Sequence, residues 1–224
     1  MPKRILFASS LFWSMILFPS LTTYAQQTQQ DSTSTPFRKG RWLTGLAGSI
    51  SSTTSVLGSA GGSDFTSQYS FDISNGKFVS DRWLVGVLFF ANRDNSEGLV
   101  SRESETLFIG PSIAHYLSNL EYGSVFVKVA PGYAQFRERV STVQNGSTTQ
   151  NRVEGSGIGG ALSLGYSYVI HDRIAFDLGV NINTFWIGAE RSVDPDGLRS
   201  DETINVSDIA FFFGFNVLLD RFFF

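Results

Sequence analysis

One stretch of sequence decides the fold: residues 157–186, which read GIGGALSLGYSYVI (157–170), HDR (171–173) and IAFDLGVNINTFW (174–186). Large apolar and small or polar side chains alternate along both long segments. A period of two residues is typical of a β-strand with two different faces, and a helix would scatter these side chains around its axis. One face carries Leu162, Leu164, Phe176, Leu178 and Val180, and the other carries Ala161, Ser163, Asp177, Asn181 and Asn183.

This alternation has two interpretations. In a soluble hairpin, the apolar face would pack against a protein core. In a transmembrane β-barrel, the same face would contact lipid, and the small or polar face would line a narrow lumen. The rest of the chain has to decide between them.

The start of the chain predicts export. Lys3 and Arg4 precede an apolar run over residues 5–18, and Thr23-Tyr24-Ala25 supplies small residues before a cleavage site. This order is typical of a secretory signal peptide, with cleavage expected after Ala25. The alternative is a membrane anchor, but the run is shorter than the roughly 20 residues that a spanning helix needs.

Charge and composition exclude several classes of function. The formal net charge is −3, so the chain lacks the basic surface of a nucleic-acid-binding protein. Without cysteine it has neither disulfides nor a thiolate metal site, and we expect no cofactor and no metal. Carboxylates at 194–202 could bind calcium, but we favour the simpler explanation of a Pro-Asp-Gly turn in a solvated loop.

The remaining sequence predicts three regions: a signal peptide (1–25), a flexible segment (26–39) and an all-β domain (40–224). Alternation and turn residues in the last region predict eight strands. We expect them over about 41–52, 66–79, 83–92, 103–117, 123–138, 157–170, 174–187 and from 203 to the end.

The connections between these strands alternate in length. Four polar loops are long, near residues 53–65, 93–102, 139–152 and 188–202, whereas those at 80–82, 118–122 and 171–173 are short. Bacterial outer-membrane barrels have short periplasmic turns and long extracellular loops. The sequence therefore predicts an eight-stranded antiparallel transmembrane barrel, an up-and-down meander in the Gram-negative outer membrane. Both termini should be periplasmic, and the first and last strands should pair, because an open edge has no partner in hydrocarbon.

Two short turns share an x-Asp-Arg sequence, Ser80-Asp81-Arg82 and His171-Asp172-Arg173. Ile170 and Ile174 lie on one face, as do Val79 and Trp83. A loop between residues of the same face must be odd in length, so we expect three-residue loops at both places.

The polar face predicts what fills the lumen. Eight strands leave room for little more than side chains. We expect a buried cluster in which Lys128 pairs with Asp72 or Asp177, because an unpaired buried charge is costly, with Asn181 and Asn183 beside it. The cluster could be a structural plug, which we favour, or an ion path. Aromatic girdles at the two membrane interfaces should include Tyr166, Tyr168 and Trp186.

The signal peptide, the strand pattern, Gly110-Pro111-x-Ile113-x-x-Tyr116 and the terminal Phe224 together resemble the OmpA/OmpX-type family of small outer-membrane β-barrels. The resemblance covers about residues 40–224. It implies outer-membrane lipid as the surroundings and insertion by the outer-membrane assembly machinery, which reads an aromatic C-terminus. One departure is that Phe224 is out of phase with the apolar face of the last strand. We expect a monomer.

For function, the sequence favours a structural role or the binding of an unidentified extracellular ligand through the outer loops. A narrow pore for ions or small solutes is the alternative. A lipid-modifying enzyme is disfavoured, because Ser112 and His115 alternate onto opposite faces and cannot act together. A soluble lipocalin-like barrel is also disfavoured, because it would need an apolar interior and a polar exterior, the reverse of the pattern in this chain.

Overall fold

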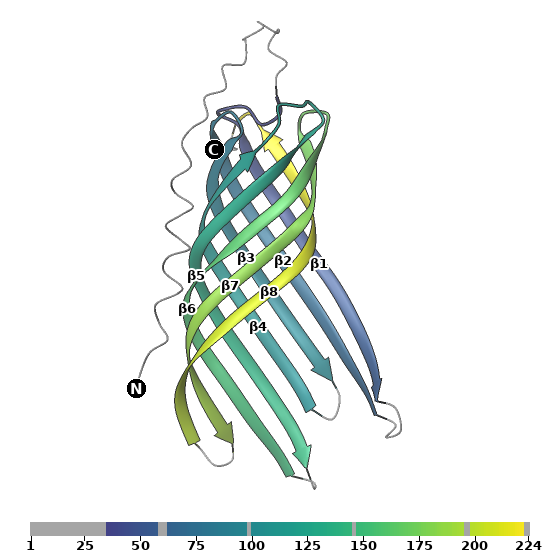
Figure 1. The fold of residues 1–224 in the computed structure, drawn as a ribbon, viewed down its shortest axis with the longest axis vertical. Coiled ribbons are helices and arrows are strands. Elements are labelled where there is room, and N and C mark those ends of the chain that lie inside the picture. Colours follow the sequence, from purple (N-terminus) through teal and green to yellow (C-terminus); the bar gives the residue numbers. More distant parts are fainter. Residues whose placement is uncertain (1–34, 58–61, 98–99, 145–146, 195–197, 222–224) are drawn as a thin grey trace, which may run out of the picture. The chain divides into compact units, whose positions relative to one another are not determined.

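A computed structural model describes residues 35–57, 62–97, 100–144, 147–194 and 198–221. They form one closed ring of antiparallel strands in which each strand pairs with its neighbours in sequence (Figure 1). The strands are β1 (Trp42–Leu57), β2 (Gly62–Ser80), β3 (Trp83–Glu97), β4 (Val100–Tyr116), β5 (Gly123–Gln144), β6 (Ser147–Ile170), β7 (Ile174–Asp194) and β8 (Leu198–Leu219).

The ring closes between the first and last strands, as the sequence predicts. β1 pairs antiparallel with β8 from Trp42 opposite Leu219 to Gly48 opposite Phe213. The short connections and both described ends of the chain lie at one end of the barrel, which we call the turn end. The four hairpins β1–β2, β3–β4, β5–β6 and β7–β8 lie at the other, which we call the hairpin end (Figure 1).

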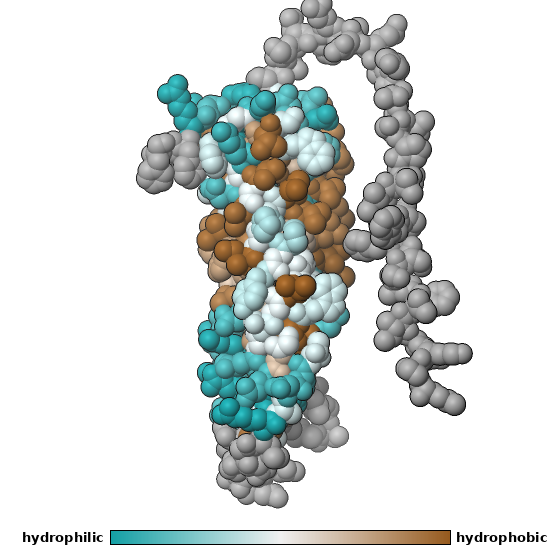
Figure 2. All heavy atoms as spheres, turned by 90° about the vertical axis from the view of Figure 1, so that its left-hand side faces the viewer, coloured by the Kyte–Doolittle hydropathy of each residue, from teal (hydrophilic) through white to brown (hydrophobic). Residues whose placement is uncertain are grey.

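The two faces of the strands have the predicted phase. Large apolar side chains point outward and are exposed, for example Leu178 at 64% and Phe213 at 59%. They form an apolar belt around the barrel, and hydrophilic residues lie beyond it toward both ends (Figure 2). Soluble proteins rarely expose a contiguous apolar surface of this size to water. The belt is therefore the lipid-facing surface of a membrane barrel.

The long polar loops of the sequence prediction are wrong. Residues 53–57, 62–65, 93–97, 100–102, 139–144, 147–152, 188–194 and 198–202 continue the strands instead. Cross-strand ion pairs support these extensions, such as Arg191 with Glu202 at 2.9 Å and Arg199 with Glu190 at 3.1 Å. The sequence pattern does not reveal these strand ends, because both of their faces carry polar residues. Alternation indicates a strand only where one face meets an apolar environment.

One of the two predicted three-residue turns is confirmed. Ile170 pairs with Ile174 around His171-Asp172-Arg173, with positive φ at His171 (52°) and Asp172 (58°). The other is wrong. Ser80 pairs with Trp83, so the loop is Asp81-Arg82 alone, and a bulge at Val79 restores the phase of β2. A bulge adds one unpaired residue to a strand. The parity argument cannot tell this residue from a loop residue, so it predicts a loop that is one residue too long.

Two predictions from the sequence lie outside the described residues: the cleavage site after Ala25, and the phase of residues 222–224. Within the part of the chain that the structure describes, no helix is long and apolar enough to cross a membrane.

Candidate functional site

The predicted polar residues meet in a layer across the middle of the barrel. Asp72, Lys128, Asn181 and Asn183 line a cavity of about 10 Å³, which has room for one water molecule at most. Asn181 Nδ2 donates to Asp72 Oδ2 at 3.2 Å, and Asn183 Nδ2 donates to Asp208 Oδ2 at 3.1 Å. The cavity is too small to serve as a path for solutes.

Lys128 lies near both predicted carboxylates and attracts each of them. Among the described residues, however, no carboxylate oxygen lies within the 4.0 Å of a contact ion pair with its ammonium group. Asp177 does not line the cavity. It is buried four residues closer to the turn end than Asn181, directly opposite Ser167. Its Oδ1 has no hydrogen-bond partner in the described structure. Lys128 therefore lies near both carboxylates without a contact ion pair to either.

Aromatic residues that the sequence analysis does not predict to fill the lumen close it on both sides of this layer. Toward the hairpin end, the rings of Phe90 and Phe108 stack at 5.1 Å, and Phe185 lies 5.6 and 5.5 Å from them. Toward the turn end, Phe126 lies 5.6 Å from Tyr116 and 6.5 Å from Phe212. We call the first three rings the phenylalanine layer. All six are buried.

Glycines on the lumen face make room for these rings. A Cβ on Gly132 would lie 2.7 Å from Phe108 Cζ, and one on Gly179 would lie 2.9 Å from Phe212 Cε1. At Gly159 a Cβ would overlap both the ring of Phe185 and the carbonyl oxygen of Thr184. The small residues that the sequence places on the lumen face therefore leave space for phenylalanine rings from neighbouring strands. Aromatic rings cover glycines in the same way in designed sheets.

We expect Gly159→Ala to lower the free energy of unfolding by about 1–3 kcal/mol, the usual cost of overpacking a filled interior. Urea unfolding in lipid vesicles measures this. Gly160→Ala is the matched control, because a Cβ there would meet only the Ala130 carbonyl oxygen at 3.6 Å. Equal effects of the two substitutions would contradict the proposed packing of Phe185 on Gly159.

The N-terminal residues 36–41 close the turn end, and we call them the N-terminal seal. The ring of Phe37 is fully buried and stacks on Tyr116 at 4.0 Å. Backbone hydrogen bonds fix the segment: Arg82 N donates to Phe37 O at 2.7 Å, and Gly40 N donates to Phe78 O at 2.8 Å. The prediction of a flexible segment is therefore wrong for residues 36–39, because Phe37 supplies an apolar anchor that the polar composition concealed.

Arg41 holds the seal from inside. Its side chain is only 2% exposed. Its two terminal nitrogens donate to Pro36 O at 2.9 Å, to Asp172 Oδ1 at 2.8 Å and to Asp172 O at 2.6 Å. Its Nε lies 3.1 Å from Asp220 Oδ1, outside hydrogen-bonding geometry. A buried guanidinium with this many partners fixes the geometry of the seal.

The repeated Asp-Arg dipeptides now have a role. A third Asp-Arg dipeptide follows β8 at residues 220–221. All three aspartates bind the N-terminal segment: Asp81 accepts from Lys39 N at 2.7 Å, Asp172 accepts from Arg41, and Asp220 accepts from Arg38 at 2.9 Å. The sequence shows the repeat but does not show that its aspartates share one partner.

Asp220 lies outside the membrane-spanning strands. Slight burial acts to raise its pKa, but the hydrogen bond from Arg38 and the charges of Arg41, Arg38 and Arg173 outweigh it and lower the pKa below its usual value. A carboxyl group with a lowered folded pKa stabilises the fold above its unfolded pKa of about 3.9, and this contribution is lost as the pH falls through the folded value.

We expect Asp220→Asn to reduce stability modestly at pH 6–7, by about 1 kcal/mol or less for an exposed ion pair. The difference from the wild type should shrink below about pH 4, where the carboxylate protonates. Urea midpoints measured over pH 3–7 test this. A difference that is independent of pH would contradict the ion pair.

The predicted interface aromatics face outward. Tyr166 and Tyr168 lie near the turn end of β6, and Trp186 lies on β7 toward the hairpin end, all of them exposed. Trp186 is the last large apolar side chain on its face of β7 before Gly188 and Glu190. These positions suit aromatic girdles at the borders of the apolar belt.

No reactive constellation appears among the described residues. Ser112 is buried in the lumen, whereas His115 lies on the outer face with its ring stacked on Trp83 at 4.3 Å. The two side chains cannot reach each other. No group of three His, Cys, Asp or Glu side chains in the described ranges could hold a metal ion.

Comparison with known proteins shows similarity in structure. Neither a protein-family model nor a curated protein matches the sequence. The outer membrane protein OprG from Pseudomonas aeruginosa matches with a TM-score of 0.52 and 15% identity, over 81% of this chain and 97% of that chain. A major outer membrane protein from Thermus thermophilus matches with a TM-score of 0.50 and 10% identity, over 80% of this chain and 99% of that chain. The chain therefore has the fold of the small eight-stranded outer-membrane β-barrels.

Proposed function

We propose that the chain is an integral outer-membrane protein with a closed lumen, which acts through the strand extensions at its hairpin end. The observation that carries this is the filled interior. The N-terminal seal, the polar layer and the phenylalanine layer succeed one another along the barrel, and the central cavity holds about 10 Å³. Transport through such an interior would require several side chains to move together.

The hairpin end then faces the outside of the cell, and both termini lie in the periplasm. The position of the apolar belt supports this orientation. At the turn end the strands stop close to the belt in short turns, whereas at the hairpin end they continue beyond it, and outer-membrane barrels keep their short turns on the periplasmic side. The extensions present charged side chains on a rigid sheet, a common way to display a binding surface. Their partners would be outer-membrane lipid or an extracellular ligand, and we propose no enzymatic activity.

Planar-bilayer recording tests the closed lumen. The wild type should give no steady conductance, because the N-terminal seal, the polar layer and the phenylalanine layer each close the lumen. Large, steady single-channel steps from the wild type would support the narrow pore instead and would remove the basis of the proposal.

A further inference from the structure

Two rows of charge cross the outward face of the extensions on β5 to β8. In the first, Arg139 lies opposite Arg152, Arg152 opposite Ser192, and Ser192 opposite Arg199. We call these three arginines the outer arginine row. In the second, two residues closer to the apolar belt, Glu154 lies opposite Glu190, and Glu190 opposite Asp201.

These side chains share a face with the lipid-facing residues. Glu154 and Ile158 lie on the outer face of β6, four residues apart, which is about 13 Å along a strand. Because barrel strands tilt by about 35–45°, the rise above the belt is smaller, about 10 Å. The charges therefore project sideways into the layer of lipid headgroups that surrounds the barrel.

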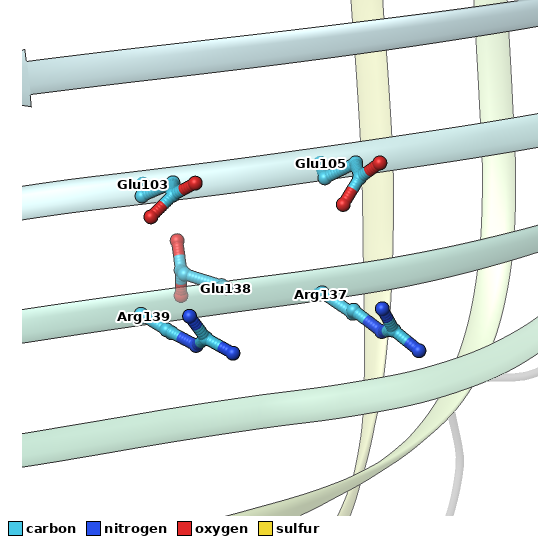
Figure 3. A pocket seen from close by; sticks show the side chains of 5 residues that line it. All are labelled: Glu103, Glu105, Arg137, Glu138 and Arg139. Atoms are coloured by element: carbon cyan, nitrogen blue, oxygen red, sulfur yellow. The ribbon is translucent and has the colours of Figure 1, made fainter.

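Arg139 has no carboxylate partner within the described ranges. Glu103 lies opposite it on β4 but forms an ion pair with Arg93 instead. On its other side stands Arg152, and like charges directly opposite each other destabilise a sheet. Figure 3 shows Arg137 and Arg139 pointing the same way from β5, with Glu138 directed differently. An anion between Arg139 and Arg152 would relieve this repulsion.

The other two arginines are oriented by the carboxylates beneath them. Arg152 lies 2.5 Å from Glu154, and Arg199 lies 3.1 Å from Glu190. They flank Ser192 at the edge of a shallow hollow of about 300 Å³. A guanidinium group held in place by one carboxylate keeps other N–H donors free, and its planar fork matches a phosphate group.

We propose that the outer arginine row binds the phosphate groups of lipid headgroups in the outer leaflet and so holds phosphorylated glycolipid against the barrel. This inference rests on the proposed function, because it requires the hairpin end to face outward. It names phosphorylated lipid as the partner of the extensions. In the second row, Glu154 positions Arg152 and Glu190 positions Arg199.

Native mass spectrometry of the refolded mature chain in nonionic detergent tests the proposal. The probes are bis-phosphorylated lipid A and the same lipid with its phosphates removed. The wild type should bind the phosphorylated lipid more tightly, and Arg139→Gln/Arg152→Gln should weaken that binding by about tenfold or more. The matched control is Arg102→Gln/Arg191→Gln, which removes the same charge from arginines that pair with the inward-facing Glu138 and Glu202. It should keep wild-type binding.

Equal binding of the two lipids by the wild type would overturn the proposal, and this comparison needs no variant to fold. Equal loss in both double variants would also overturn it, because binding would then follow net charge and not the outer face. If the barrel bound both lipids equally and gave no steady conductance, the phosphate-binding proposal would fail and the closed lumen would stand. The two proposals can therefore fail separately.

Discussion

Arg41→Ala is expected to lower the free energy of unfolding by about 2–4 kcal/mol. The guanidinium group is buried and is bound by Pro36 O and by Asp172 through side chain and backbone. Removing one partner of a buried charged contact typically costs about 3–5 kcal/mol, and the half-exposed Asp172 reduces that figure because water can reach it. Urea unfolding in vesicles, followed by tryptophan fluorescence, provides the measurement.

Arg38→Ala is the matched control for this substitution. Arg38 contacts the same two aspartates, Asp172 at 3.5 Å and Asp220 at 2.9 Å, but its side chain is 35% exposed. Exposed ion pairs contribute about 1 kcal/mol or less, so the Arg38 variant should remain near the wild type. If both variants lost the same stability, burial of Arg41 would not be what holds the seal.

Phe185→Ala is expected to cost about 3–5 kcal/mol, the usual range for a large-to-small change at a buried phenylalanine. Its ring is fully buried and packs against both Phe90 and Phe108. The substitution would leave a cavity in the lumen, which lipid cannot reach. The same vesicle unfolding assay gives the stability of both this variant and its control.

Phe213→Ala provides that control, since Phe213 is exposed on the outer face of β8. It loses the transfer of an aromatic ring from water to lipid, about 1.5–3 kcal/mol, but lipid chains fill the space that it leaves. The Phe185 variant should therefore be less stable than the Phe213 variant by about 1 kcal/mol or more. The reverse order would indicate that the phenylalanine layer is loosely packed.

The sequence predicts the fold wherever a strand has two different environments. Leu178 and Asp177 are neighbours on opposite faces, and one such pair fixes the phase of β7 from Ile174 to Trp186. Closure of β1 on β8 follows from the membrane, where an unpaired strand edge is costly. The turn at His171 follows from parity.

Elsewhere the sequence signal is weak for physical reasons. Alternation places Phe90 on the lumen face of β3, but it does not show that this ring meets Phe108 and Phe185, which lie on other strands. In the extensions, both faces of β5 and β6 carry polar side chains, and alternation disappears. The N-terminal seal depends on contacts between residues far apart in sequence: Phe37 stacks on Tyr116, and Arg41 binds Asp172, which lies 131 residues away. Local patterns do not report such contacts.

Reagent access to a single cysteine in the lumen tests the closed barrel most directly, because the chain has no cysteine of its own. Ser163→Cys places a thiol in the wall of the central cavity, and Ser192→Cys places one on the extension. With a charged, water-soluble thiol reagent applied to cells or vesicles, a closed lumen predicts rapid labelling of the Ser192 variant and little labelling of the Ser163 variant. Labelling of both at similar rates would contradict the closed lumen.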